Sequence, residues 1–309
     1  MGTDEFDARK NGLKMKRNIF NIQRFSTKDG PGIRTTVFFQ GCHLNCAWCH
    51  NPESIPLAPR LQYFEDKCCG CRACERVCKK GVHTFDADGK HHLRIELCVL
   101  CGQCVTCCPT ESLQYRNKDY TVEELADIVL KDKAYYQSSG GGVTLSGGEP
   151  MLQADYILQL LKTLKEHGIH TAVDTAANVA FAEFKKVMPY TDLFLVDIKA
   201  MDPDVHKAYT GVKNDLILKN IERLSGAGQD IIIRMPVIKG VNDDVGGIRK
   251  AGEFLAKQKN IRCVQLLPYH SYGLYKGASV GIERRDFAPP ENIEQLVGEL
   301  CKFGIKAEV

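Results

Sequence analysis

The chain has 309 residues, with 41 Lys plus Arg against 38 Asp plus Glu, and 44% of its residues are hydrophobic. The formal net charge of +3 is close to neutral, which argues against a nucleic-acid partner and against attraction to an anionic membrane surface. The hydrophobic content supports a sizeable core, and no apolar run approaches membrane-spanning length. We therefore expect a cytoplasmic protein with one large domain and room for a small insertion.

The N-terminus and the cysteine content together indicate metal binding. Residues 1–17 are charged and lack the apolar stretch of a secretory signal, so we expect an N-terminal extension there. Without a secretory signal, 15 cysteines favour metal ligation over disulfides. Four of them lie outside spaced motifs and are expected to be packed or incidental thiols: Cys69, Cys107, Cys263 and Cys301.

The first predicted strand, 35–40, leads into a loop that contains Cys42, Cys46 and Cys49. Three thiolates with C-x3-C-x2-C spacing can hold three corners of a cubic iron–sulfur cluster and leave the fourth iron open to a small molecule. A structural zinc site completed by His43 or His50 is the alternative. It is less favoured, because zinc ligands usually come in two separated pairs.

The next segment repeats the spacing C-x2-C-x2-C-x3-C, which is typical of two-cluster bacterial ferredoxins. In that arrangement the fourth cysteine of each run binds the cluster of the other run. The predicted ligand sets are Cys68, Cys71, Cys74 and Cys108 for one cluster, and Cys98, Cys101, Cys104 and Cys78 for the other. We interpret 61–117 as a ferredoxin-like insert that relays electrons, with a structural or docking role as the alternative.

Strands and helices alternate through the rest of the chain. Further strands are predicted at 143–146, 171–175, 193–199, 231–237 and 263–267. Helices are predicted from the capping box at Thr121 toward Tyr136, and near 154–167, 180–188, 215–226, 245–258 and 290–302. Six βα units predict an α/β fold, a partial (β/α)6 TIM-type barrel formed by 18–60 and 118–309.

Polar residues and glycines follow several of these strands, at the end where barrels of this type carry their active residues. The candidates are Gly147, Gly148, Glu149, Asp174, Thr175, Asp197, Lys199, Arg234 and His270. Taken alone, the glycines are compatible with an ordinary turn, and Asp197 with Lys199 is compatible with a strand-end salt bridge. A lone His or Arg at a strand end is often only a satisfied polar group.

The cysteine loop, with Trp48 before its third cysteine, resembles the signature of the radical S-adenosylmethionine (SAM) superfamily. Segments 29–35 and 51–54 resemble the activating enzymes of glycyl radical enzymes. The resemblance implies that Trp48 and the 147–150 motif belong to the SAM site, with the motif holding the SAM amino group. It also implies that Arg234 contacts SAM and that His270 lies beside the adenosyl group. Positions around SAM are implied for Asp174, Thr175, Asp197 and Lys199, the first three also with a monovalent cation.

The resemblance further implies a reaction and its partners. Three 4Fe–4S clusters and SAM are expected as cofactors, with Cys42, Cys46, Cys49, Lys199 and His270 as catalytic residues. One electron cleaves SAM to a 5′-deoxyadenosyl radical, which removes a Cα hydrogen from a glycine of a glycyl radical enzyme. That partner is a dehydratase, a decarboxylase or a C–N or C–S lyase.

Reduced flavodoxin or ferredoxin is expected to donate the electron to a monomeric, oxygen-sensitive enzyme. Asp29 is a hypothetical contact for the incoming glycine loop. Two alternatives remain open: a radical SAM enzyme with another peptide or small-molecule substrate, and a non-enzymatic ferredoxin-type carrier.

Overall fold

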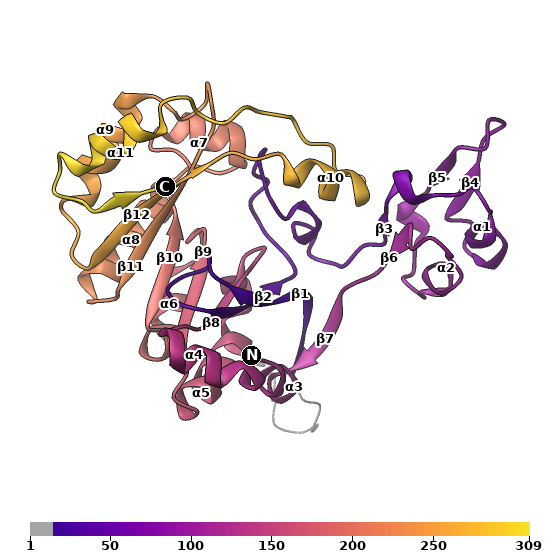
Figure 1. Ribbon diagram of the computed structural model, residues 1–309, viewed down its shortest axis with the longest axis horizontal. Coiled ribbons are helices and arrows are strands. Elements are labelled where there is room, and N and C mark those ends of the chain that lie inside the picture. Colours follow the sequence, from indigo (N-terminus) through magenta and orange to yellow (C-terminus); the bar gives the residue numbers. More distant parts are fainter. Residues whose placement is uncertain (1–14) are drawn as a thin grey trace, which may run out of the picture.

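The computed structural model describes residues 15–309, so most of the predicted extension 1–17 lies outside the described residues. Within the described part, nine strands form one sheet in the order β13-β12-β11-β10-β9-β8-β2-β1-β7 (Figure 1). The six predicted strands are confirmed to within a few residues. They are parallel: β2 (Arg34–Phe39), β8 (Gly142–Gly147), β9 (His170–Thr175), β10 (Leu193–Asp197), β11 (Ile231–Val237) and β12 (Ile261–Pro268).

Three further strands were not predicted, and two of them make the sheet mixed. Strand β1 (Lys16–Ser26) runs antiparallel to both β2 and β7 (Lys118–Thr121). The short strand β13 (Ala307–Glu308) pairs with β12 at the other edge. The predicted end of the N-terminal extension, residue 17, therefore falls inside a strand. Polar residues interrupt the apolar alternation of β1, which explains why its pattern did not predict a strand.

Helices cover one face of this sheet (Figure 1). They are α3 (Val122–Val129), α4 (Lys133–Ser139), α5 (Ala154–Glu166), α6 (Phe181–Val187), α8 (Asp215–Gly226), α9 (Val245–Leu255) and α11 (Ile293–Cys301). The capping box at Thr121 is confirmed, but the helix predicted toward Tyr136 is divided by a 3-10 turn at Leu130–Asp132. No helix in residues 15–309 is long and apolar enough to cross a membrane.

Outside the insert, two helices were missed, α7 (Pro203–Thr210) and α10 (Tyr272–Ser279). The signal for α7 was present in the sequence. The Asp202 side chain accepts hydrogen bonds from the backbone N–H groups of Asp204 and Val205, and proline occupies the first helical position. An acidic N-cap followed by proline is a common way to begin a helix.

The two faces of the parallel strands differ in chemistry. One face packs against the helices through fully buried residues such as Val143, Val173 and Ile233. On the opposite face, a small apolar cluster fills the N-terminal half of the strands: Ala172, Leu193, Leu195, Ile232 and Cys263. Beyond that cluster, toward the C-terminal ends, the same face carries Asp174, Asp197 and Arg234. The polar side chains therefore gather at one end of the sheet, above an apolar floor.

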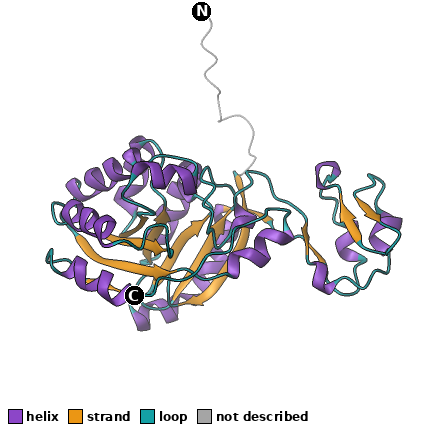
Figure 2. Cartoon of the chain, turned by 90° about the horizontal axis from the view of Figure 1, so that it is seen from above, coloured by secondary structure: helices purple, strands orange, loops and turns teal. Residues whose placement is uncertain are grey.

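Residues 62–114 project away from the large sheet in both views (Figures 1 and 2). They form two small sheets and two short helices: β3 (Gln62–Tyr63) with β6 (Leu113–Gln114), β4 (His83–Phe85) with β5 (His91–Leu93), α1 (Ala73–Val77) and α2 (Gln103–Thr106). The buried centre consists of Leu61, Leu113 and two cysteines, Cys74 and Cys104. Thiols thus make up half of a very small core.

Arg34, inside the 29–35 segment, is fully buried and acts as a structural tie. Its Nε donates to Thr144 Oγ1 (2.6 Å), its Nη2 to the carbonyl of Val143 (2.8 Å), and its Nη1 to the carbonyl of Pro31 (3.2 Å). Burial lowers the pKa of Arg34 to about 10, and the nearby Asp29 opposes this effect. The guanidinium therefore fixes the 29–35 turn against β8.

We expect the Arg34→Met variant to lose about 3–5 kcal/mol of unfolding free energy, because it strands buried acceptors that the guanidinium now satisfies. Lys219→Met is the matched control on an exposed helix position and should change stability by about 0.5 kcal/mol or less. Urea unfolding followed by circular dichroism measures both. Equal stability of the two variants would contradict the structural role of Arg34.

Candidate functional site

A cavity of about 500 Å³ lies at the C-terminal ends of the parallel strands, a size suited to a cofactor. Nearly all of the predicted site residues of the large domain line it; among them only Glu149 does not. The lining includes Cys42, Cys46, Trp48, Cys49, Gly147, Gly148, Asp174, Thr175, Asp197, Lys199, Arg234 and His270. Residues from six separate strand ends thus meet around one space.

The cysteine loop is held in place on both sides by backbone hydrogen bonds. Its start is closed by Gly41 N–H donating to the carbonyl of Ser54 (2.8 Å). Its middle rests on the end of α7, where Asn45 N–H donates to the Thr210 carbonyl (2.9 Å) and Ala47 N–H to the Tyr209 carbonyl (2.8 Å). The ring of Trp48 packs against Tyr209, with ring centroids 5.7 Å apart. The unpredicted helix α7 therefore fixes the position of the three thiols.

Burial raises the pKa of all three loop thiols, that of Cys49 to about 12. Buried thiolates are stable only beside positive charge, and an iron ion supplies such charge when thiolates ligate it. The loop is therefore suited to hold a metal group rather than free thiolates.

The turn after β8 touches the start of the cysteine loop. Gly148 N–H donates to the Phe39 carbonyl (2.9 Å), and Glu149 N–H donates to the Gly41 carbonyl (2.8 Å). A Cβ atom on Gly148 would lie 2.2 Å from the Gly41 oxygen, which no side chain tolerates. Glycine is therefore required at position 148 because the backbone after β8 lies directly against the backbone after β2. This requirement is independent of any ligand that binds nearby.

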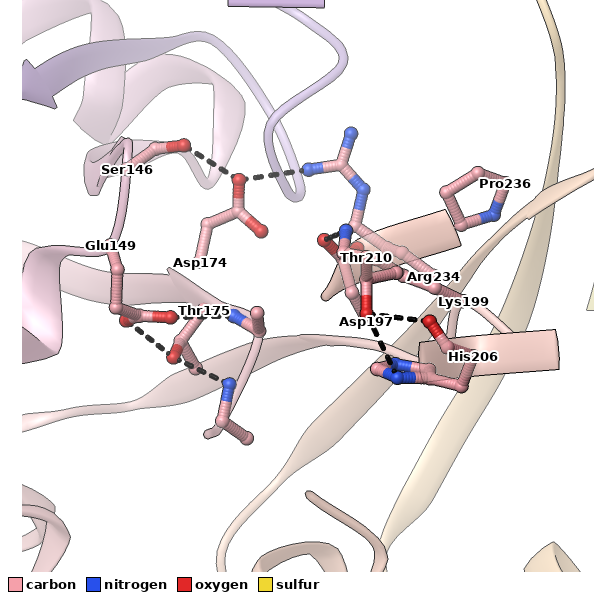
Figure 3. A network of polar contacts seen from close by, with 12 residues as sticks. Ser146, Glu149, Asp174, Thr175, Asp197, Lys199, His206, Thr210, Arg234 and Pro236 are labelled. Atoms are coloured by element: carbon pink, nitrogen blue, oxygen red, sulfur yellow. Dashed lines mark hydrogen bonds and ion pairs between the residues drawn. The ribbon is translucent and has the colours of Figure 1, made fainter. Parts of the chain in front are cut away.

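The carboxylate of Glu149 is fully buried, does not line the cavity, and ties this turn to the end of β9 (Figure 3). It accepts hydrogen bonds from Thr175 Oγ1 (2.7 Å), Ala176 N–H (2.9 Å) and Met151 N–H (3.1 Å). Burial raises the pKa of Glu149 to about 7, against the effect of these three donors. The side chain therefore braces the turn, and the hydroxyl of Thr175 is engaged in the same brace.

Acidic and basic side chains alternate across the cavity (Figure 3). Asp174 accepts hydrogen bonds from Ser146 Oγ (2.6 Å) and Arg234 Nη1 (3.1 Å), and burial raises its pKa despite that arginine. Asp197 forms an ion pair with Lys199 (2.7 Å). Burial opposes the charge of Lys199, but Asp197 raises its pKa overall. The expected cation site thus has its two carboxylates already paired with basic side chains.

Two histidines stack at the edge of the cavity. The rings of His50 and His270 are 3.6 Å apart and inclined by 23°. Burial lowers the pKa of both, that of His50 to about 4. The sequence suggested His50 only as an alternative zinc ligand. No sequence pattern predicts that its ring stacks on His270.

Three buried polar atoms on residues that line the cavity have no hydrogen-bond partner within residues 15–309: Trp48 Nε1, Arg234 Nε and His270 Nδ1. Such atoms are rare in folded proteins and indicate a missing partner. The lining combines these residues with carboxylates and a lysine, and it therefore fits a polar, charged molecule such as SAM.

The insert contains two further groups of thiols. Cys68, Cys71, Cys74 and Cys108 surround one cavity. Cys78, Cys98, Cys101 and Cys104 surround a second, of about 190 Å³. Burial raises the pKa of Cys74 to about 12 and that of Cys104 to about 11. The four cysteines that the crossed ferredoxin pattern predicts are present around each cavity, and Cys69, predicted as an incidental thiol, also lines the first.

Comparisons with known proteins are consistent with this site. The model of the radical SAM superfamily matches residues 96–250, which include strands β8 to β11 but not the loop at 42–49. The (2S)-3-sulfopropanediol dehydratase activating enzyme of Klebsiella oxytoca is 40% identical over 306 residues, covering 94% of this chain and 96% of the relative. The choline trimethylamine-lyase activating enzyme of Oleidesulfovibrio alaskensis is 40% identical over 276 residues, covering 88% of this chain and 89% of the relative.

Among solved structures, SuiB of Streptococcus suis bound to the precursor peptide SuiA is similar in fold alone. The TM-score is 0.53 at 14% identity, over 87% of this chain and 46% of that chain. SAM and a 4Fe–4S cluster are the cofactors that the superfamily implies. Identity of 40% over nearly the whole length shows that this chain belongs to the radical SAM activating enzymes of glycyl radical enzymes.

Proposed function

We propose that this enzyme cleaves SAM reductively in the 500 Å³ cavity and abstracts a Cα hydrogen from one glycine of a partner glycyl radical enzyme. The observation that carries this proposal is that the cysteine loop and the polar strand ends line one and the same cavity. The three loop thiols and the charged residues at the ends of three strands, β9, β10 and β11, line the same space. A ferredoxin-type carrier would need the thiols but would have no use for such a cavity.

In this proposal Cys42, Cys46 and Cys49 ligate the cluster that binds SAM. When both are bound, the reduced cluster supplies the electron that breaks a sulfur–carbon bond of SAM and produces the 5′-deoxyadenosyl radical. The protein contributes position and exclusion of water, because the apolar floor closes the N-terminal end of the strands.

The remaining cavity residues would orient SAM through polar contacts. The backbone at Gly147 and Gly148 would hold the amino group, and Arg234 and His270 would contact other polar atoms of SAM. Trp48 would border the same site, and Lys199 offers positive charge near Cys46 and Cys49. For a monovalent cation at Asp174, Thr175 and Asp197, the support is the family resemblance alone.

Asp29 would lie beside the incoming glycine loop, and it also belongs to the interior network. Its carboxylate accepts hydrogen bonds from Ser26 (2.6 Å) and Thr36 (2.7 Å) and lies 4.0 Å from Arg234. Replacing Asp29 would therefore disturb Arg234, which is proposed to contact SAM, as well as the proposed contact with the glycine loop.

We further propose that the sheet is a partial (β/α)6 TIM-type barrel, formed by 18–60 and 118–309, with 61–117 as a ferredoxin-like insert. The insert would hold two 4Fe–4S clusters, in the sets Cys68, Cys71, Cys74, Cys108 and Cys98, Cys101, Cys104, Cys78. Support comes from the two thiol-lined cavities. A reduced flavodoxin or ferredoxin would deliver electrons to a monomer in the cytoplasm, where thiols and clusters stay reduced.

Electron paramagnetic resonance (EPR) tests the proposed substrate. We expect the reconstituted enzyme, reduced and mixed with SAM and the glycyl radical enzyme encoded beside it, to produce a glycyl radical doublet on the partner. The Cys46→Ala variant should yield neither the doublet nor 5′-deoxyadenosine, whereas Cys301→Ala, at an exposed thiol outside the motifs, should retain both. Formation of 5′-deoxyadenosine without any doublet would favour a different peptide or small-molecule substrate.

Iron analysis tests the three-cluster assignment. The triple variant Cys42→Ala, Cys46→Ala, Cys49→Ala should keep about eight of about twelve irons, because two four-iron clusters remain in the insert. It should also lose all SAM cleavage. Iron content near zero in this variant would contradict the two insert clusters, and content near twelve would contradict the ligand role of the loop.

A further inference from the structure

The segment 282–288, which follows α10, is held against the cysteine loop. At its start, Ile282 N–H donates to the carbonyl of Gly277 in α10 (2.9 Å). Near its end, the ring of Phe287 lies edge-on to that of Trp48, with ring centroids 6.1 Å apart. The segment is therefore anchored at α10 on one side and at the aromatic residue of the cysteine loop on the other.

Arg284, in the middle of this segment, contacts the loop directly. Its Nη1 donates to Asn45 Oδ1 (2.9 Å), and Asn45 immediately precedes Cys46. A Cβ atom on Gly277 would lie 3.1 Å from Cγ of Arg284, so the glycine leaves room for this side chain. Arg284 does not line the 500 Å³ cavity. Its guanidinium therefore reaches the loop from a side other than the SAM site.

The charge of Arg284 has no counter-charge among residues 15–309. Its side chain bonds there only to the neutral amide of Asn45, and its Nε and Nη2 are buried without a partner. Burial raises the pKa of Cys46 and of Cys49, and the positive charge of Arg284 opposes this rise at both thiols. A cation with buried nitrogens is costly without an anion nearby. The thiolates of the loop are the negative groups that this arginine faces.

Lys199 is a second cation near the same two thiols, but its situation differs. It forms an ion pair with Asp197 (2.7 Å), and it lines the SAM cavity. Its charge is therefore already compensated, and replacing it would also disturb the SAM site. Arg284 has no such ion pair among the described residues and lies outside that cavity, so its effect on the loop can be measured separately.

We propose that the positive charge of Arg284 raises the reduction potential of the cluster held by the three loop cysteines, from outside the SAM cavity. The inference rests on the proposed function, because it requires that cluster. A 4Fe–4S core bound by three thiolates is an anion, and reduction adds one more negative charge. A nearby cation stabilises the more negative state and so favours reduction. Arg284 acts on the cluster through its charge and has no part in holding SAM.

A purely structural role is the alternative. The hydrogen bond to Asn45 would then only fasten segment 282–288 to the loop, and the potential would not depend on the charge. Lysine separates the two interpretations, because it keeps the charge of arginine but loses its planar fork of donors.

The test measures the potential of the loop cluster in the full-length reconstituted enzyme without SAM. Arg284→Met removes the charge, and Arg284→Lys keeps it. Arg285→Met is the control, because it removes a positive charge from the next residue, which is exposed and lies over the ring of Phe287 (5.1 Å). Each protein is reduced stepwise with titanium(III) citrate and followed by EPR. The signal of the loop cluster is the one that is missing from the triple-alanine variant of the loop.

We expect Arg284→Met to lower the equilibrium constant for reduction of the loop cluster about tenfold, equivalent to about 59 mV for one electron. Arg284→Lys should change this constant by less than about threefold, because the charge remains. Arg285→Met should leave the potential unchanged. Iron content should stay at about twelve in all three variants. Their affinity for SAM, measured by calorimetry, should equal that of the parent.

The contrary outcomes are distinct. An unchanged potential in Arg284→Met, with about twelve irons retained, would overturn the effect of the charge. An equal fall in Arg284→Met and Arg284→Lys would also overturn it, because the charge would then not be the cause. Loss of the loop cluster from Arg284→Met would overturn it in favour of the structural role. A parent enzyme with about eight irons and no loop signal would overturn the loop cluster itself, and the proposed function with it.

Discussion

The close approach of three strand ends is the constraint on which the site depends. The turn after β8 donates backbone hydrogen bonds to Phe39 and Gly41, at the point where β2 becomes the cysteine loop. The carboxylate of Glu149, in the same turn, is held by Thr175 and Ala176 at the end of β9. Cysteine loop, glycine turn and Asp174 strand are thereby fixed to one another before any ligand binds. Such preorganisation is what a radical enzyme needs, because a radical formed out of position reacts with whatever is nearest.

Charge and burial complete the cavity. Three carboxylates from separate segments, Asp29, Asp174 and Asp197, share two basic partners, Arg234 and Lys199. Each charge is compensated, so the cavity tolerates burial without a ligand, yet Arg234 keeps one nitrogen free. A ligand with both amino and carboxylate groups can exchange partners within such a network at little electrostatic cost. The apolar cluster at the N-terminal half of the strands closes that end of the cavity to water.

Spacing and periodicity predicted the parallel strands, the thiol groups and most of the cavity lining, because those features are local in the chain. The sequence did not predict long-range relations. Strand β1 was missed because its pattern is irregular and its pairing with β7 is about a hundred residues distant. The bracing role of the Glu149 side chain was not predicted either, since the direction of a side chain is set by the fold. Asp202 and Pro203 could have predicted the start of α7 from the sequence. The contact of that helix with the cysteine loop could not be predicted, because it depends on the fold.

The Gly148→Ala variant tests the central claim, that the glycine turn sets the position of the cysteine loop. The added Cβ would meet the Gly41 carbonyl at 2.2 Å, whereas the control Gly226→Ala adds its Cβ into open space. Both proteins are reconstituted and reduced with dithionite, and 5′-deoxyadenosine is measured over time. We predict a rate at least about tenfold lower for Gly148→Ala, equivalent to about 1.4 kcal/mol in the barrier, with the insert iron retained. Equal rates for the two variants would contradict the claim.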